Sequence, residues 1–391
     1  MKNQLFEKLN AAFEDMQVIR RHLHMHPEVS FHETNTAKYI QEFYANLGVE
    51  YTANVGGNGV VARIKGVFPG KTVALRADFD ALPIQDEKDV PYKSTVPGVM
   101  HACGHDGHTA TLLVLGKTLF EMREQLSGEY VLIHQHAEEY APGGAKPMIE
   151  AGCLEGVDAI FGTHLWSLTP SGTVEYRVGP VMAAADRFEV TIQGRGGHGA
   201  SPHQTKDAIV IGAQVVTNLQ QIVSRRVNPV ESAVISVGSF VANNAFNVIA
   251  DSAKLVGTVR SFNPEVRDLL EKELERVIEG TCLANDCSYE FVYVRGYSAV
   301  VNHEAETLLL KDVAEQIPDI KEVRETEQHM GGEDFAYYLE KVPGTFFFTG
   351  AMPDGEVYPH HHPKFDFDEN AMLIAAKTLG AAVIEYQETE K

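Results

Sequence analysis

Side chains that bind metals are concentrated in one short stretch of this sequence, between two apolar segments. Residues 101–109 read HACGHDGHT and contain three histidines, one cysteine and one aspartate. Thiolate and imidazole groups are the ligands that zinc and its first-row neighbours prefer. A Cys-x-His pair can also direct both donor atoms to one point. The stretch therefore predicts a metal site, with a hydrogen-bonded polar loop as the alternative.

Four further polar clusters strengthen the metal hypothesis, because each follows a predicted strand. They are RADFDALP at 76–83, HQHAEE at 134–139, GTHLW at 162–166 and HHHP at 360–363. In open α/β sheets, ligands bind at the carboxyl ends of the strands. We therefore expect donor groups that are distant in the sequence to converge at one edge of a sheet.

Length and composition predict two domains and an acidic protein without disulfides. The 391 residues, of which 44% are hydrophobic, are sufficient for two cores. The net charge of -21 repels phosphate backbones and anionic lipid surfaces, so we expect neither a nucleic-acid nor a membrane partner. No signal peptide or long apolar run is evident. The four cysteines are too few for a disulfide framework, which favours a cytoplasmic location.

The order of the predicted elements indicates an α/β fold class. Helical patterns at 33–47 and 109–124 alternate with strand patterns at 59–64, 72–75 and 130–133. A strand pattern at 158–161 follows and ends before the third of the four clusters. This alternation predicts βαβ units and a mostly parallel central sheet.

The pattern changes after residue 185. Strand, helix, strand, strand, helix and strand follow in that order, at 187–193, 206–223, 233–240, 253–262, 264–283 and 288–294. This is the order of a ferredoxin-like α+β unit. Because the last histidine cluster comes after it, we expect a discontinuous first domain at 1–184 and 299–391 and an inserted domain at 185–298.

The order of several motifs resembles the metal-dependent aminoacylase branch of the di-metal exopeptidases. The motifs are RRHLH at 20–24, CGHD at 103–106, HAEE at 136–139, GTHL at 162–165, GGHGASPH at 196–203, GGEDF at 331–335 and HHP at 361–363. That branch includes hippurate hydrolases, N-acetyldiaminopimelate deacetylases and hydrolases of auxin conjugates. The resemblance implies that the first domain is catalytic and binds metal, and that the inserted domain is a lid used in dimerisation.

The resemblance also implies an activity. It indicates a metal-dependent amidohydrolase that cleaves the amide bond of N-acyl amino acids, such as N-acetyl or N-benzoyl derivatives. It implies two divalent metal ions per subunit, Zn or Mn, with Co or Ni as alternatives, and a homodimer or higher homo-oligomer. The alternative is a di-metal dipeptidase or aminopeptidase acting on short peptides. Those enzymes recognise a free α-ammonium group, whereas the pattern around Cys103 favours the amide-hydrolase branch.

Matched by position, the resemblance implies five metal ligands: Cys103, His105, Glu139, His164 and His361. His361 is chosen because the matching histidine stands two residues before a proline, while His360 and His362 are weaker candidates. Where the peptidase branches have a ligand histidine, this chain has the segment Asp78-Phe79-Asp80. We expect Cys103 to compensate as a bridging thiolate, and contact of Asp78 with metal is left open.

The chemistry of amide hydrolysis requires these residue types. Two metal ions about 3.5–4 Å apart can share a hydroxide and polarise the scissile carbonyl. A carboxylate must then carry a proton to the leaving nitrogen, a role that the resemblance gives to Glu138. The alternative for Glu138 and Glu139 is the start of a solvated loop. Asp80 is expected to orient a ligand imidazole, or else to form a turn before Pro83.

The inserted domain contributes three further candidates. By resemblance, His198 reaches the active site of the partner subunit and stabilises the carbonyl oxygen as negative charge develops. Asn247 and Arg260 resemble residues that bind the substrate, and a guanidinium can bind a carboxylate with two hydrogen bonds. The alternatives are a surface histidine and an exposed strand arginine. A non-catalytic metal-binding module is a rival class, but it would have no need of Glu138.

Overall fold

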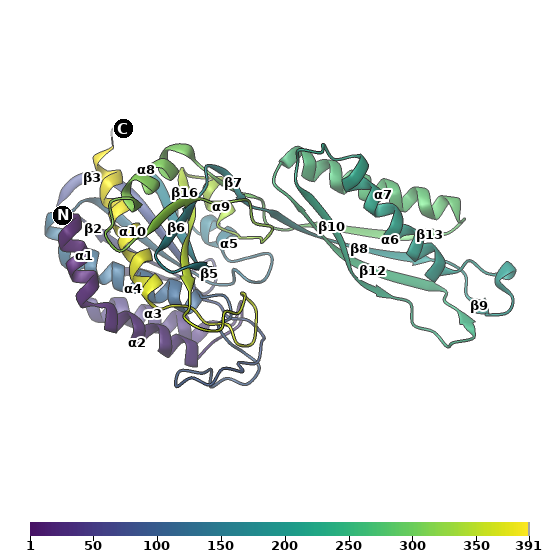
Figure 1. Cartoon of the computed structure of the whole chain (residues 1–391), viewed down its shortest axis with the longest axis horizontal. Coiled ribbons are helices and arrows are strands. Elements are labelled where there is room, and N and C mark those ends of the chain that lie inside the picture. The colour runs from purple at the N-terminus through teal and green to yellow at the C-terminus, as the bar shows by residue number, and fades with distance from the viewer. Residues whose placement is uncertain (390–391) are drawn as a thin grey trace. The chain divides into compact units, whose positions relative to one another are not determined.

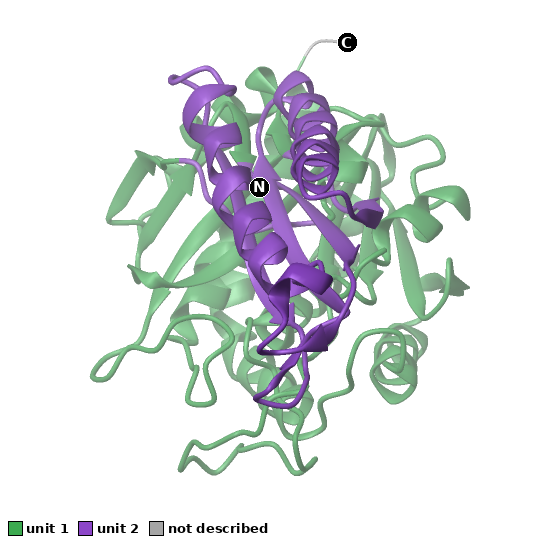
Figure 2. Cartoon of the chain, turned by 90° about the vertical axis from the view of Figure 1, so that its right-hand side faces the viewer, with its two compact units in different colours: residues 1–181, 300–327, 334–391 green, residues 182–299, 328–333 purple. Residues whose placement is uncertain are grey.

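The computed structural model describes residues 1–389, which form two compact units (Figure 2). Unit 1 contains Met1–Val181, Val300–Glu327 and the described residues from Asp334 onward. Unit 2 contains Met182–Ala299 and Gln328–Glu333. Both units are built from helices and strands, which Figure 1 labels along the chain.

Within the described residues 1–389, the central sheet of unit 1 has eight strands. Their order is β1-β2-β4-β3-β5-β16-β6-β15. The strands are β1 (Glu50–Val55), β2 (Gly59–Lys65), β3 (Phe68–Asp78), β4 (Ser127–Gln135), β5 (Ala159–Pro170), β6 (Thr173–Tyr176), β15 (Glu322–Glu325) and β16 (Gly344–Met352). The central strands β4, β3, β5 and β16 run parallel, while β2 and β6 flank them antiparallel. The predicted α/β class with a mostly parallel sheet is confirmed.

Helices bury the central strands of unit 1. They are α1 (Lys2–Ala11), α2 (Phe13–Met25), α3 (Thr34–Leu47), α4 (His105–Met122), α5 (Ala145–Glu150), α8 (Glu304–Ala314), α9 (Ala336–Leu339) and α10 (Asn370–Glu388), with a 3₁₀ turn at Arg123–Gln125. Side chains such as Leu75, Leu115 and Phe347 are fully buried in one apolar cluster. Parallel strands covered in this way read as continuous apolar runs, which explains the patterns at 72–75 and 130–133.

Helix α4 begins at His105, four residues before the predicted start at 109. The sequence pattern assigned the polar residues before Thr109 to a loop, but their side chains have buried partners. Asp106, for example, accepts a hydrogen bond from Arg20 at 2.9 Å. Gly104 precedes the helix with a φ of 100°, a conformation that glycine adopts without steric cost. The first turn of the helix therefore carries side chains that the sequence placed in a loop.

Strand β5 is longer than predicted. The sequence pattern ended the strand at residue 161, but β5 continues to Pro170 and His164 lies inside it. His164 is opposite Phe348 of the parallel strand β16. A polar residue within a strand resembles a loop residue by composition alone. The backbone around His164 stays paired with β16, and the His164 side chain is buried like those of its neighbours in the strand.

Unit 2 is a ferredoxin-like α+β fold, as predicted. Its antiparallel sheet has the order β10-β12-β8-β13. The elements are β8 (Ala184–Gln193), α6 (Ala208–Arg225), β10 (Ala233–Val241), β12 (Ser252–Ser261), α7 (Pro264–Ala284) and β13 (Ser288–Arg295). Figure 2 shows both helices on one side of the strands. Strand residues such as Val190 and Leu255 pack with Leu219 and Leu274 of the helices.

Short elements complete the two units. They are β7 (Gly179–Met182), β14 (Val300–Asn302), β9 (Gly197–His198), β11 (Val248–Ile249) and a 3₁₀ turn at Pro202–Gln204. β9 pairs with β11 inside unit 2. Among the described helices, none is both long enough and apolar enough to cross a membrane.

Candidate metal centre

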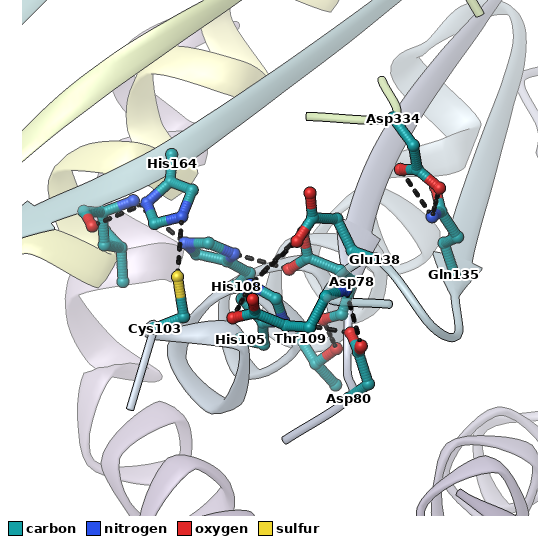
Figure 3. A network of polar contacts seen from close by, with 12 residues as sticks. Asp78, Asp80, Cys103, His105, His108, Thr109, Gln135, Glu138, His164 and Asp334 are labelled. Atoms are coloured by element: carbon teal, nitrogen blue, oxygen red, sulfur yellow. Dashed lines mark hydrogen bonds and ion pairs between the residues drawn. The ribbon is translucent and has the colours of Figure 1, made fainter. Parts of the chain in front are cut away.

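The five predicted metal ligands come from separate segments of unit 1. Cys103 lies in the loop before α4 and His105 in the first turn of that helix. Glu139 follows β4, His164 lies in β5, and His361 lies between β16 and α10. The structure brings these segments together, and Figure 3 shows the Cys103 sulfur directed at the His164 ring.

The donor atoms of these residues form two groups. Those of Cys103, His105 and His164 lie within 4.8 Å of one another. Those of Cys103, Glu139 and His361 form a second group with the same spacing. The Cys103 sulfur belongs to both groups, which is the place that a bridging ligand occupies between two ions. The geometry therefore offers two adjacent ion positions.

Hydrogen bonds fix the orientation of two of the histidine rings. Nδ1 of His164 donates to the carbonyl oxygen of Leu165 at 2.8 Å, which leaves Nε2 as the lone-pair atom, 3.4 Å from the Cys103 sulfur. Nδ1 of His105 lies 3.1 Å from Oδ1 of Asp80, which leaves Nε2 of that ring facing the other donors. This is the usual arrangement of metal-binding histidines, in which one nitrogen donates to an oxygen and the other binds the ion.

Among the described residues, two buried polar atoms of the centre lack a hydrogen-bond partner. Nε2 of His105 and Oε1 of Glu139 are both buried and unsatisfied, although only 3.8 Å separates them. A buried unsatisfied polar atom costs about 1–3 kcal/mol. A cation bound between the two atoms would satisfy both. The residues present therefore fit a divalent metal ion.

The electrostatics of the centre also favour a cation. Burial opposes protonation of His105, but the carboxylates of Asp78, Asp80 and Glu139 outweigh it and raise the pKa of that imidazole to about 10. Burial, followed by the charges of Glu139 and Glu138, raises the pKa of the Cys103 thiol well above its usual value. A thiolate at this position therefore requires compensating positive charge, which a divalent ion would provide.

Asp80 connects three parts of the centre. Besides His105, it accepts hydrogen bonds through Oδ2 from the backbone N–H of Glu139 at 2.9 Å and from Oγ of Ser30 at 2.7 Å. Burial opposes ionisation of the carboxyl, but the hydrogen bonds from His105, Glu139 and Ser30 lower its pKa. Asp80 thus lies where a residue that orients a ligand imidazole would be.

Glu138 lies beside the two candidate ion positions. Its Oε2 is 3.9 Å from Nε2 of His105, and its side chain is buried. Donor atoms of His105, Glu138 and Glu139 form a third group within 4.8 Å. The pair is therefore part of the centre and does not begin a solvated loop.

Glu33 supports this carboxylate pair, although the sequence analysis did not single it out. Its Oε1 accepts a hydrogen bond from the backbone N–H of Ala137 at 2.8 Å, and its Oε2 accepts one from Asn58 at 3.0 Å. Ala137 has a φ of 52°, so the backbone turns sharply just before the pair. Burial raises the pKa of Glu33 to about 7. No local sequence signal connects Glu33 to a turn that lies more than 100 residues away.

His108 and Asp78 form a support behind His105. Oδ1 of Asp78 lies 2.6 Å from Nδ1 of His108, and Oδ2 accepts a hydrogen bond from Arg76 at 2.6 Å. Nε2 of His108 accepts the backbone N–H of Leu165 at 2.9 Å, so both nitrogens of this ring have protein partners. His108 was also not singled out as a site residue. Its spacing of three residues from His105 would have indicated a shared helix face, had the helix start been placed correctly.

The three consecutive histidines near the C-terminus have different surroundings. Nε2 of His361 lies 3.3 Å from Oε2 of Glu139, within the second group of donors. His360 accepts the backbone N–H of Ser167 through Nε2, and its Nδ1 lies 3.8 Å from the Cys103 sulfur. The ring of His362 stacks on Tyr358 instead. The geometry therefore favours His361 as the ligand and His360 as a hydrogen-bond donor to the thiolate.

The other three predicted site residues lie in unit 2. His198 of β9 pairs with Val248 of β11, next to Asn247, and both His198 and Asn247 are exposed. Arg260 in β12 is half-buried, and its Nε donates to the backbone carbonyl oxygen of Met330 at 3.1 Å. The structure thus brings His198 and Asn247 together, with Arg260 on a different sheet. The roles of these three residues remain predictions.

A family model agrees with this arrangement. The model described as Peptidase family M20/M25/M40 matches residues 74–385. The chain belongs to this family. The predicted resemblance to the di-metal exopeptidases is confirmed, and the chain is identified as an enzyme of the hydrolase class.

Individual relatives of this M20/M25/M40 family member cover most of its length. The chain is 60% identical over 390 residues to YhaA of Bacillus subtilis (strain 168), which covers 99% of this chain and 98% of YhaA. It is 48% identical over 303 residues to the N-acyl-L-amino acid amidohydrolase of Geobacillus stearothermophilus, covering 78% of this chain and 82% of that relative.

A solved structure links the fold to metal binding. The crystal structure of the YXEP protein of Bacillus subtilis, described as a dinuclear metal binding peptidase from the M20 family, has a TM-score of 0.84 and 36% sequence identity. The match covers 97% of this chain and all of that chain (100%). The donor groups of this enzyme and its likeness to YXEP together support divalent metal ions.

The first prediction concerns the sulfur that the two donor groups share. Replacing Cys103 with serine removes the thiolate from both ion positions. We expect metal affinity to fall by more than the roughly 10–100-fold that follows loss of an outer hydrogen-bond partner. Metal content per chain, measured by mass spectrometry after dialysis, checks this.

The matched control is Cys153→Ser, which changes another buried cysteine of unit 1 that belongs to none of the donor groups found in residues 1–389. This variant is expected to keep its metal ions. Circular dichroism is used to check that both variants are folded. Full metal occupancy in folded Cys103→Ser protein would rule out the shared-sulfur arrangement.

Proposed function

We propose that this enzyme hydrolyses the amide bond of N-acyl amino acids with two bound divalent metal ions. The observation that carries the proposal is the pair of donor groups joined at the Cys103 sulfur, with the Glu138 carboxylate beside them. The proposed ligands are Cys103, His105, Glu139, His164 and His361. The name of the Geobacillus stearothermophilus relative, an N-acyl-L-amino acid amidohydrolase, supports the substrate class.

Glu138 supplies the acid–base chemistry in this proposal. Two divalent ions held by these ligands would lower the pKa of a water molecule and polarise the substrate carbonyl. Glu138 then takes the proton of the attacking water and gives it to the amide nitrogen as the C–N bond breaks. The products are a carboxylic acid and a free amino acid. The buried position of Glu138 beside His105 supports this role, because electrostatic interactions of a carboxylate are stronger where it is shielded from bulk water.

Three residues of unit 2, namely His198, Asn247 and Arg260, are proposed to contact the substrate. Nδ1 of His198 accepts the backbone N–H of Ala200 at 3.1 Å, so the neutral ring carries its proton on Nε2. That N–H can donate to the carbonyl oxygen as negative charge develops. Because His198 is exposed, we propose that it acts in the active site of the partner in a homodimer. Asn247 and Arg260 are proposed to bind the polar groups and the carboxylate of the substrate.

We also propose a cytoplasmic location. The four cysteines of the chain lie within the described residues and are all free thiols. Free thiols persist most readily in a reducing compartment.

A panel of substrates distinguishes this function from the alternative peptidase. The panel contains N-acetyl, N-benzoyl and indole-acetyl amino acids together with dipeptides that have a free α-ammonium group. The proposal predicts hydrolysis of the N-acyl compounds, and it predicts that a chelator abolishes the activity. Hydrolysis of the dipeptides alone would reject the proposal and establish the dipeptidase or aminopeptidase alternative.

The second prediction separates the base from the ligands. Replacing Glu138 with glutamine removes the proton acceptor but keeps the shape of the side chain. We expect kcat to fall by about 10²–10⁴-fold with unchanged metal content, because proton transfer is lost while the ligands remain. Glu139→Gln is the contrasting variant and should lose metal. If Glu138→Gln protein loses its metal ions instead, Glu138 is a ligand and the assignment of the two residues is reversed.

The third prediction tests action across a dimer. His198→Ala protein should fold, bind metal and lose most of its activity. Co-expression with Glu138→Gln protein should restore part of the activity, because in heterodimers one active site has both an intact base and an intact lid histidine. Differently tagged chains allow purification of the heterodimer.

The control is His203→Ala, which removes another exposed histidine from the same segment and should retain activity. A purified heterodimer with no recovered activity would show that His198 does not act in the active site of a partner.

A further inference from the structure

We propose that an apolar pocket beside the metal centre binds the acyl group of the substrate and selects bulky apolar acyl groups such as benzoyl. The proposal rests on the function proposed above and specifies its substrate class. The pocket lies entirely within unit 1 and has a volume of about 320 Å³. Its walls come from three segments, which are residues 29–32, 81–83 and 139–140.

The lining of the pocket is mainly apolar and partly aromatic. Val29, Phe31, Leu82 and Pro83 supply apolar surface. Tyr140 stands at the pocket with 70% of its surface exposed, and Phe31 is 41% exposed. Exposed aromatic side chains that line a cavity are typical of small-molecule sites, which measure roughly 300–1,000 Å³.

The backbone of Phe31 is unusual. Its φ is 68°, in the left-handed region that bulky side chains rarely adopt. Such conformations cost of order 1–3 kcal/mol and persist where the surrounding structure enforces them, often at ligand sites. The Phe31 ring also lies edge-on to His136 at 6.0 Å between ring centres. The chain therefore holds this aromatic ring at the pocket at an energetic cost.

The pocket is continuous with the metal centre through Glu139 and Asp80. Glu139 lines the pocket and also belongs to the second group of metal donors. Oδ2 of Asp80 accepts hydrogen bonds from Ser30 on one wall and from Glu139 on the other. The same carboxylate thus sets the position of the pocket walls and of His105. A group held in the pocket lies next to a carbonyl bound at the metal centre.

Charge decides which half of the substrate enters. Among the described residues, those that line the pocket include no lysine or arginine, and the ionisable ones are His32, Tyr140 and the proposed metal ligand Glu139. The amino-acid half of an N-acyl amino acid carries a carboxylate, which would find neither a lysine nor an arginine to pair with among these lining residues. The acyl half is uncharged beyond its carbonyl group. The pocket therefore fits the acyl group.

The fourth prediction removes the aromatic walls. Phe31→Ala and Tyr140→Ala are each assayed with N-benzoylglycine and N-acetylglycine, and the ratio of the two kcat/KM values is compared with that of the unaltered enzyme. We expect the benzoyl-to-acetyl ratio to fall by about tenfold or more, a typical effect for lost apolar contact in a specificity pocket. Metal content is measured for each variant to show that the neighbouring centre is intact.

Phe68→Ala is the matched control, because Phe68 is another exposed phenylalanine of unit 1, at 53%, and does not line the pocket. Its ratio should equal that of the unaltered enzyme. An unchanged ratio in both pocket variants would overturn the inference. So would a change confined to the preference between N-acetylglycine and N-acetylphenylalanine, because the pocket would then hold the amino-acid side chain.

The two proposals fail in different ways. If the unaltered enzyme hydrolyses none of the N-acyl compounds, the proposed function is rejected and the acyl pocket with it. If the unaltered enzyme is active and the pocket variants keep its benzoyl-to-acetyl ratio, only the acyl pocket is rejected.

Discussion

The hydrogen bonds of one buried carboxylate hold the candidate site together. Asp80 follows the central strand β3 and is 1% exposed, so both of its oxygens need partners inside the protein. Those partners are a ring nitrogen of His105, a backbone N–H of Glu139 and the hydroxyl of Ser30. They come from α4, from the segment after β4 and from the loop before α3. The metal centre and the adjacent pocket therefore both depend on the position of Asp80.

The same region concentrates negative charge that the described side chains do not balance. Asp78 has Arg76 and His108 as partners, but Glu139 keeps an unsatisfied buried oxygen beside an unsatisfied nitrogen of His105. Divalent ions bound here would balance this charge and would stabilise the proposed Cys103 thiolate. A bound cation would thus offset the cost of burying anionic groups at this sheet edge.

Much of the fold and the general position of the candidate site could be predicted from the sequence, because strand ends and donor spacing are local signals. The parallel sheet, the ferredoxin-like unit and the convergence of donor clusters at one sheet edge are of this kind, whereas the individual ligands around Cys103 were implied by the family resemblance. The start of α4 and the extent of β5 were wrong, because His105 and His164 are polar residues whose buried partners lie far away in the chain. Local periodicity carries no information about partners such as Asp80. For the same reason it could not reveal the contact between Glu33 and Ala137.

The proposed metal centre has two metal ions that share the Cys103 sulfur. Anomalous X-ray diffraction from crystals of the metal-loaded enzyme, measured above and below the absorption edge of the bound metal, tests it most directly. We expect two anomalous peaks about 3.5–4 Å apart, both within bonding distance of the sulfur, with His105 and His164 at one peak and Glu139 and His361 at the other. A single peak, or two peaks of which neither contacts the sulfur, would show that the two ions do not share Cys103.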